Sequence, residues 1–493
     1  MGRVATSPEQ PDPRRWRALA VTLAAGFMTL LDVSIVTVAL PSIQQGLEAS
    51  VAGAQWVVSG YALTFGLVLV SGGRLGDAVG RRRMFLIALS AFVLTSALCG
   101  AAVSEPMLVF SRLAQGMAAG LLTPQNTGLI QELFRGAERG RAFGMFGATV
   151  GIATAVGPVL GGFIISLFGP EQGWRWVFFV NIPIGAVALV LAARLLPAAA
   201  PRKRSLLADL DLAGMVLLGL AVGSVLLPLV ESEQGGLSSL WWLFVAAAVL
   251  GAAFVRWERR MLRRNRSPLL DLRLYTETPG YAAGASIATV YFSGFTGIWL
   301  VFAMFFQRGL GYSALQSGLA VTPFALGSAV SAVVAGRLVS RWGRRLTIAG
   351  LGLVALGLGT VGVVAQLVPP QQLGYAVALP LLVAGTGGGM VISPNTTLTL
   401  DRVPTRLAGV AGGALQTGQR IGSAVGVALL ASVFHARING AGHSYPVALS
   451  LAMSCSVGVV LIALVLAVLD HRRQVERGEA KKARSVTGAG PLE

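Results

Sequence analysis

Residues 73–82 read GRLGDAVGRR, and the same pattern returns 263 residues later as GRLVSRWGRR at residues 336–345. Three further stretches recur in the same order along the chain. They pair residues 44–47 with 307–310, 123–127 with 393–396, and 151–157 with 420–426. Similarity that keeps its order over a long offset indicates an internal duplication. The sequence therefore predicts two related halves, each carrying one copy of the glycine- and arginine-rich motif.

Apolar stretches fill most of the space around these motifs. Apolar residues make up 54% of the 493 residues and charged residues 12%, about half the charged share of a soluble domain. A membrane span needs about 20 mostly apolar residues, and because lipid offers no partner to the backbone we expect helices. Fourteen stretches qualify, at residues 18–40, 54–73, 84–103, 107–131, 142–167, 175–196, 211–230, 239–259, 282–306, 315–339, 346–367, 375–399, 407–435 and 446–469.

The repeated stretches pair the second expected span with the tenth, the fourth with the twelfth and the fifth with the thirteenth. An even shift preserves orientation, so the repeats are parallel. The sequence thus predicts an all-α polytopic membrane protein with two six-helix bundles and an inserted helix pair. The expected segments are an N-terminal tail at 1–17, a bundle at 18–196, basic loops and inserted helices at 197–281, a bundle at 282–469 and a C-terminal tail at 470–493.

The net charge of +18 would by itself suggest a nucleic-acid-binding protein. However, most of the 39 basic residues fall in alternate loops and in the two tails. Because positive residues concentrate on the cytoplasmic side of membrane proteins, both tails are predicted to be cytoplasmic. The clusters at 202–204 and 256–266 are interpreted as topology determinants, with contact to anionic lipid as a secondary interpretation. Nucleic acid is not an expected partner.

The sequence contains no motif that is typical of a metal-binding or cofactor-binding site. The two cysteines lie in apolar runs, and the three histidines lack metal-ligand spacing. A phosphate-binding GxxxxGK[ST] loop does not occur. The composition and these absences argue against an enzyme and against ATP-driven transport, and no cofactor or metal is expected.

Asp32 is the only carboxylate placed well inside an expected span. An ionisable group there costs roughly 2.5–3.5 kcal/mol on insertion scales, so its presence indicates a role. We interpret Asp32 as a group for proton coupling, for recognition of a cation, or for both; a structural hydrogen-bonding acid is the alternative. Arg112 and Arg420 reach similar depths and are candidate partners, with snorkelling or packing as their alternatives.

Taken together, the motifs resemble those of the major facilitator superfamily, in its 14-span drug:proton antiporter branch of the EmrB/QacA type. Residues 73–82 are similar to the superfamily signature between spans 2 and 3. Residues 108–120, with Arg112 and Gln115, resemble the span-4 motif of proton-coupled members. GPVLGG at 157–162 resembles the span-5 antiporter motif, and two further stretches resemble motifs of the 14-span branch, at residues 31–41 and 174–183.

This resemblance assigns roles to two groups of residues. The signature implies a gate in which Asp77 belongs to a charge relay; capping of the following turn is the alternative. The gating residues are Gly73, Asp77, Gly80, Arg81, Arg82, Gly336, Gly343 and Arg344. The antiporter motif comprises Gly157, Pro158, Gly161 and Gly162. Proline in a helix interior predicts a kink, and the glycines permit close helix approach, so conformational exchange and simple packing are both open.

Aromatic and polar residues in the spans are candidates for lining a substrate cavity. Aromatic rings can stack on apolar or cationic compounds, although placement against lipid is an equal alternative. The candidates are Trp56, Tyr61, Asn126, Tyr291, Phe295, Trp299, Asn395 and Gln416.

The resulting functional hypothesis is proton-coupled export of amphipathic, hydrophobic or cationic organic compounds by alternating access. Its expected partners are protons, the small-molecule substrate and membrane lipid, and its expected form is a functional monomer in a bacterial plasma membrane. Uptake symport of a small metabolite and a non-transporting membrane receptor are the alternatives. The substrate itself, and whether one compound or many are exported, is left open by the sequence.

Overall fold

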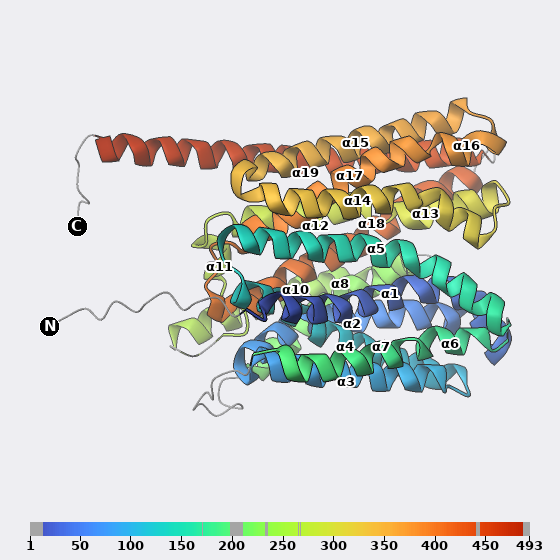
Figure 1. Ribbon diagram of the computed structural model, residues 1–493, viewed down its shortest axis with the longest axis horizontal. Coiled ribbons are helices and arrows are strands. Elements are labelled where there is room, and N and C mark those ends of the chain that lie inside the picture. The colour runs from blue at the N-terminus through green and yellow to red at the C-terminus, as the bar shows by residue number, and fades with distance from the viewer. Residues whose placement is uncertain are drawn as a thin grey trace.

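The computed structural model describes residues 13–169, 171–197, 211–231, 235–264, 266, 268–439 and 444–486. Within these residues every regular element is helical. The long helices run roughly side by side, and Figure 1 shows α1 and α19 with their chain ends at the same end of the bundle. The basic cluster at 202–204 lies outside the described residues.

The length and composition of the helices suit a membrane. Eleven of the described helices are long and apolar enough to cross one, or twelve if the two arms of α5 form one span. Two further long helices, α4 (Glu105–Leu133) and α10 (Trp242–Arg263), are not among these candidates. α10 ends in a run of charged residues, and α4 contains Arg112 together with polar side chains such as Gln125 and Asn126.

The N-terminal half contains the first seven helices. They are α1 (Arg15–Leu47), α2 (Val51–Val79), α3 (Arg81–Gly100), α4, α5 (Gly136–Phe168), α6 (Gly173–Phe179) and α7 (Asn181–Leu195). One hydrophobic core includes Phe85 and Phe92 of α3 and another includes Trp174 of α6, all with no exposed surface. These cores draw their buried residues from this half alone.

The inserted segment forms a helix pair with two short helical turns. Its elements are α8 (Leu212–Val230), α9 (Gly236–Ser239), α10 and α11 (Arg273–Thr276). α8 packs against α10 and also against α2 and α18. The inserted pair therefore contacts both halves of the molecule.

The C-terminal half follows. Its elements are α12 (Tyr281–Phe295), α13 (Ile298–Met304), a π-helical turn (Phe305–Gly309), α14 (Ala314–Trp342), α15 (Arg344–Leu367), α16 (Pro370–Ala376), α17 (Ala378–Leu400), a 3-10 turn (Thr405–Leu407), α18 (Ala408–Asn439) and α19 (Tyr445–Val486). Its main core is separate from that of the N-terminal half.

The two copies of the repeated motif shape equivalent turns. Gly80 separates α2 from α3 with φ 102°, and Gly343 separates α14 from α15 with φ 51°. Both values lie in the left-handed region that glycine adopts without a Cβ clash. We call the end of the bundle that holds these turns the motif end; it is the left end in Figure 1.

The two halves meet along two seams. At one, α2 crosses α18, and a Cβ on Gly73 would lie 2.2 Å from the backbone oxygen of Gly409. At the other, α5 crosses α14, and a Cβ on Gly140 would lie 2.5 Å from the oxygen of Gly336. The first glycine of each motif copy, Gly73 or Gly336, is thus where one half touches the other.

Several expected spans are interrupted rather than continuous. The span expected at 175–196 consists of α6 and α7, and the span at 282–306 consists of α12, α13 and the π turn. α5 bends by 40° between its arms Gly136–Thr154 and Val159–Phe168, and the intervening residues include Pro158, as a proline kink predicts. α19 continues as a helix beyond residue 469, where a tail was expected.

Candidate functional site

A buried ion pair lies inside the N-terminal half. Asp32 comes from the middle of α1 and Arg112 from α4, and Arg112 Nη1 lies 2.5 Å from Asp32 Oδ2. The Asp32 side chain has no exposed surface and that of Arg112 has 1%. Two buried charges are tolerated only when they are paired and hydrogen-bonded, so each residue requires the other. The partnership expected from their similar depth is confirmed.

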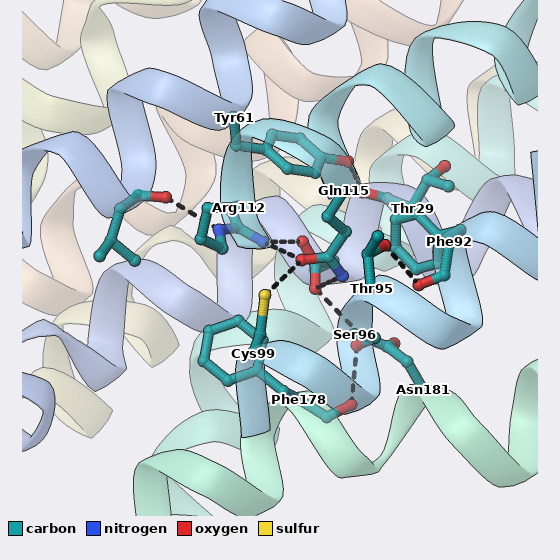
Figure 2. A network of polar contacts seen from close by, with 12 residues as sticks. Thr29, Tyr61, Phe92, Thr95, Ser96, Cys99, Arg112, Gln115, Phe178 and Asn181 are labelled. Atoms are coloured by element: carbon teal, nitrogen blue, oxygen red, sulfur yellow. Dashed lines mark hydrogen bonds and ion pairs between the residues drawn. The ribbon is translucent and has the colours of Figure 1, made fainter. Parts of the chain in front are cut away.

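Amide side chains complete the coordination of Asp32. Its Oδ1 accepts hydrogen bonds from Gln115 Nε2 at 3.1 Å and Asn181 Nδ2 at 3.0 Å. Gln115 lies one helical turn from Arg112 and accepts a bond from its Nη1 at 2.8 Å. Asn181 also donates to Ser96 Oγ of α3, and Figure 2 shows these labelled side chains converging around the ion pair.

The guanidinium of Arg112 is held on its other sides as well. Its Nε donates to the carbonyl oxygen of Val57 on α2 at 2.8 Å. Its Cζ lies 4.2 Å from the ring centre of Tyr61 and 5.6 Å from that of Phe178. A cation over aromatic faces gains further attraction. The described hydrogen-bond and aromatic partners of the pair therefore come from α2, α4, α6 and α7 of the N-terminal half (Figure 2).

Arg420 on α18 does not join this cluster by a direct contact. Its Cζ lies 4.3 Å from the ring centre of Phe65, and Phe65 stacks on Tyr61 with ring centres 6.0 Å apart. Tyr61 in turn lies against Arg112. The structure therefore links Arg420 to the ion pair through two aromatic rings instead of through Asp32.

At the motif end, Asp77 connects the halves. Its carboxylate accepts hydrogen bonds from Arg81 at 3.0 Å and from the backbone N–H groups of Gly409 and Val410 at 3.3 and 3.1 Å. Those N–H groups belong to the first turn of α18, which carries unpaired donors and a partial positive charge. Asp77 thus caps a helix of the opposite half.

Arg81 extends the same network. It pairs with Glu132 of α4 at 3.1 Å and donates to the carbonyl oxygen of Thr405, in the opposite half, at 2.6 Å. Arg82, by contrast, donates to the carbonyl oxygen of Ala193 within its own half. Two more ion pairs lie at this end, Arg15 with Glu138 and Arg139 with Asp401.

The second copy of the motif uses a different acid. Ser340 stands where the first copy has Asp77. Arg344, the counterpart of Arg81, instead pairs with Asp470 of α19 at 2.8 Å and donates to Asn395 Oδ1 at 2.5 Å. Asn395 also donates to the carbonyl oxygen of Gly284. These contacts stay within the C-terminal half, so the two motif copies are not equivalent.

A comparison with known protein families agrees with the duplication and with the contacts between the two halves. The sequence matches the Major Facilitator Superfamily over residues 22–209 and 212–427. The chain belongs to the Major Facilitator Superfamily. Its fold also resembles the human organic anion transporter MFSD10, with a TM-score of 0.68 at 15% identity, covering 93% of this chain and 100% of that one.

Two bacterial relatives within this superfamily are similar over most of the chain. A probable actinorhodin transporter of Streptomyces coelicolor is 37% identical over 434 residues, covering 86% of this chain and 73% of the relative. The puromycin resistance protein of Streptomyces alboniger is 35% identical over 506 residues, covering 98% and 96%. The chain is therefore a multi-pass membrane transporter by family.

Residues 157–162, expected from the sequence to form an antiporter motif, lie where α5 packs on α1. A Cβ on Gly157 would lie 1.9 Å from Ser34 Oγ, and one on Gly161 would lie 3.0 Å from Ile35. Ser34 also donates to the carbonyl oxygen of Ala153. Gly162 has nothing within 4 Å of its Cβ position, so only two of the three glycines are required for close approach.

The candidate cavity residues do not form one lining. In the C-terminal core Tyr291, which has no exposed surface, stacks on Phe295, and Phe295 makes an edge-on contact with Trp299. Asn395 accepts a hydrogen bond from Arg344 of the second motif copy. Asn126 and Gln416 are also buried, and each has an oxygen without a hydrogen-bond partner among the described residues. Trp56 remains partly exposed on α2.

Asn181, Ser96 and Cys99 were not among the site residues expected from sequence. Cys99 Sγ lies 3.4 Å from Gln115 Oε1, and Asn181 bonds Asp32 directly. For Ser96 and Cys99, an uncharged polar residue in an apolar stretch is the only signal in the sequence, whereas Asn181 also lies in the stretch 174–183 that resembles a motif of the 14-span branch. Such residues are frequent in membrane helices, so the signal does not distinguish a site from ordinary packing.

Proposed function

We propose that the protein is a proton-coupled antiporter that exports amphipathic organic compounds of antibiotic type. The observation that carries the proposal is the enclosed Asp32–Arg112 pair, because a proton on Asp32 removes the charge that holds Arg112. Protonation and release of Arg112 are then a single event. The names of the two bacterial relatives, a transporter of actinorhodin and a protein of puromycin resistance, support export of such compounds.

The link from Arg112 through Tyr61 and Phe65 to Arg420 supports a connection between proton and substrate. Freed from Asp32, the Arg112 side chain would shift against Tyr61 and so disturb the ring on which Arg420 rests. In this mechanism the N-terminal half binds the proton, and Arg420 transmits the change to the C-terminal half. Amphipathic compounds would bind between the halves.

We further propose the membrane arrangement that this mechanism needs. The twelve candidate spans, together with α4 and α10, give fourteen. The basic loops at the motif end support a cytoplasmic motif end with both termini in the cytoplasm, in a bacterial plasma membrane. The closed contacts of Asp77 and Arg81 then seal the cytoplasmic side. A monomer contains the complete mechanism.

The test uses inside-out vesicles from cells that express the full chain. We expect puromycin uptake when the vesicle lumen is acidified, and loss of this uptake in Asp32→Asn, because an amide does not exchange a proton. Asp271→Asn is the matched control, since Asp271 pairs with Arg273 outside the described network. Proton-driven puromycin uptake that persists in Asp32→Asn would show that the coupling assignment is wrong.

A further inference from the structure

The two seams between the halves differ in what lies over them. α8 of the inserted pair packs against α2 and α18, and thereby covers the first seam. At the second seam, between α5 and α14, apolar side chains remain exposed. Met145 of α5 is 37% exposed there, and on the adjacent face of α14, towards α17, Val330, Val334 and Leu338 are 65%, 47% and 38% exposed. In a membrane this exposed seam faces lipid, and Figure 1 shows α5 and α14 side by side along it.

A cavity of about 400 Å³ opens at the motif end of this second seam. Both halves contribute to its walls. The lining residues are Trp16 of α1, Arg141 and Met145 of α5, and Val333 and Arg337 of α14. It is therefore a basic pocket with apolar and aromatic walls.

The arginines of this pocket lack the partners that their neighbours have. In the part of the chain described, neither Arg141 nor Arg337 takes part in an ion pair, whereas Arg15 is paired with Glu138 and Arg139 with Asp401. The nearby acids are thus already engaged. Arg141 and Arg337 directly follow the crossing glycines Gly140 and Gly336. Two cations held near this crossing repel each other and oppose its closure.

A separate apolar groove lies on the adjacent face of α14, where Val334 and Leu338 directly follow the pocket residues Val333 and Arg337. Its volume is about 430 Å³. Leu326, Val330, Val334 and Leu338 line it from α14 at intervals of one helical turn, and Leu382 belongs to its α17 side. The groove therefore follows the long axis of the helices, which is the direction of an acyl chain in a bilayer.

We propose that Arg141 and Arg337 bind the headgroup of an anionic phospholipid, whose acyl chain lies in the groove on α14, and that this lipid stabilises the closed motif end. A phosphate accepts hydrogen bonds from both guanidinium groups and cancels their repulsion. Trp16 suits the boundary between headgroups and acyl chains. The assignment to the cytoplasmic leaflet rests on the proposed function.

The experiment measures a distance across the seam and does not depend on transport. Spin labels are attached at Ala137→Cys on α5 and Ser340→Cys on α14, both exposed positions at the motif end, with Cys455→Ser. The protein is placed in vesicles of phosphatidylcholine alone or with phosphatidylglycerol. We expect phosphatidylglycerol to raise the ratio of the short to the long distance by about fivefold for each arginine engaged.

Three variants separate a specific site from general surface charge. Arg141→Gln and Arg337→Gln should each lose most of the response to phosphatidylglycerol. Arg341→Gln is the matched control, because Arg341 is exposed one turn further along α14 and does not line the pocket, and it should keep the response. Arg337→Glu can pair directly with Arg141, so it should favour the short distance in phosphatidylcholine alone.

Equal responses in Arg337→Gln, Arg341→Gln and the unmodified protein would overturn the proposal. So would an equal shift caused by glycerol phosphate in phosphatidylcholine vesicles, because that soluble headgroup has no acyl chain for the groove. If proton-driven export fails while the distance still responds to phosphatidylglycerol through Arg141 and Arg337, the proposed function is wrong and the lipid site remains.

Discussion

Asp32 and Arg112 show how a charge is kept inside an apolar bundle. Each Asp32 oxygen has a donor, and the Arg112 guanidinium has an anion, two oxygen acceptors and two aromatic faces. The surroundings replace the water that both groups lose on burial. An arrangement of this kind is sensitive to the charge of either partner, which is the property that proton coupling requires.

Removing one partner should therefore be more harmful to stability than removing both. In Arg112→Gln the Asp32 carboxylate stays buried without a cation, which we expect to destabilise the protein by about 3–5 kcal/mol. In Asp32→Asn/Arg112→Gln the unpaired charge is gone, so most of that stability should return while proton coupling does not. Thermal unfolding in detergent and proton release on substrate addition measure the two effects. A double variant as unstable as Arg112→Gln would contradict this account.

For single residues, the sequence predicts which charged side chains lie within the spans, but not all of the side chains that contact them. Asp32 and Arg112 were identifiable because a charged residue in a span is rare. Asn181 was not identifiable as a ligand of Asp32, since it lies 149 residues away and belongs to another helix. The contact of Arg420 with Phe65 likewise depends on how α18 packs against α2.

At the scale of helices, the close contact between α1 and α5 depends on glycines, which have no side chain. Gly157 and Gly161 face α1: a Cβ on Gly157 would overlap Ser34, and one on Gly161 would lie 3.0 Å from Ile35. Sequence reasoning predicted close approach, and the bend in α5 includes Pro158 as expected. Which glycine matters was not predictable, because the face that each presents depends on the local path of the bent helix.

The three glycines should consequently differ when each is replaced by alanine. Gly157→Ala places a methyl group against Ser34, and we expect a loss of about 1–3 kcal/mol from overpacking together with impaired transport. Gly162→Ala is the matched control in the same motif, and should leave both unchanged because its Cβ position is open. Thermal unfolding and puromycin uptake by vesicles report the result. Equal losses in the two variants would contradict the packing explanation.

At the scale of the whole molecule, the motif end is closed by contacts of unequal strength. Asp77 is buried and accepts N–H groups from α18, whereas Asp401 is exposed and lies 3.7 Å from Arg139. Exposed ion pairs contribute about 0–1 kcal/mol, and a carboxylate at a helix N-terminus up to about 2 kcal/mol when partly buried. Asp77 should thus dominate closure.

We therefore expect Asp77→Asn to shift the molecule toward an open motif end. The amide has a weaker interaction with the first turn of α18 and with Arg81, so the distance between labels at Ala137→Cys and Ser340→Cys should lengthen in a larger fraction of molecules. Asp401→Asn should have little effect on the same measurement. The assignment fails if Asp401→Asn opens the motif end as strongly as Asp77→Asn.

The duplication, the helical membrane fold, the charges within the spans and the position of the repeated glycine- and arginine-rich motif could all be predicted from the amino-acid sequence. These follow from periodicity, hydropathy and repeated residues, which are local properties of the chain. Three contacts could be seen only once the helices were packed together: Asn181 binds Asp32, Asp470 pairs with Arg344 of the second motif copy, and Arg141 and Arg337 line one pocket. The physical reason is that these contacts join residues of different helices, so they depend on the packing and rotation of whole helices.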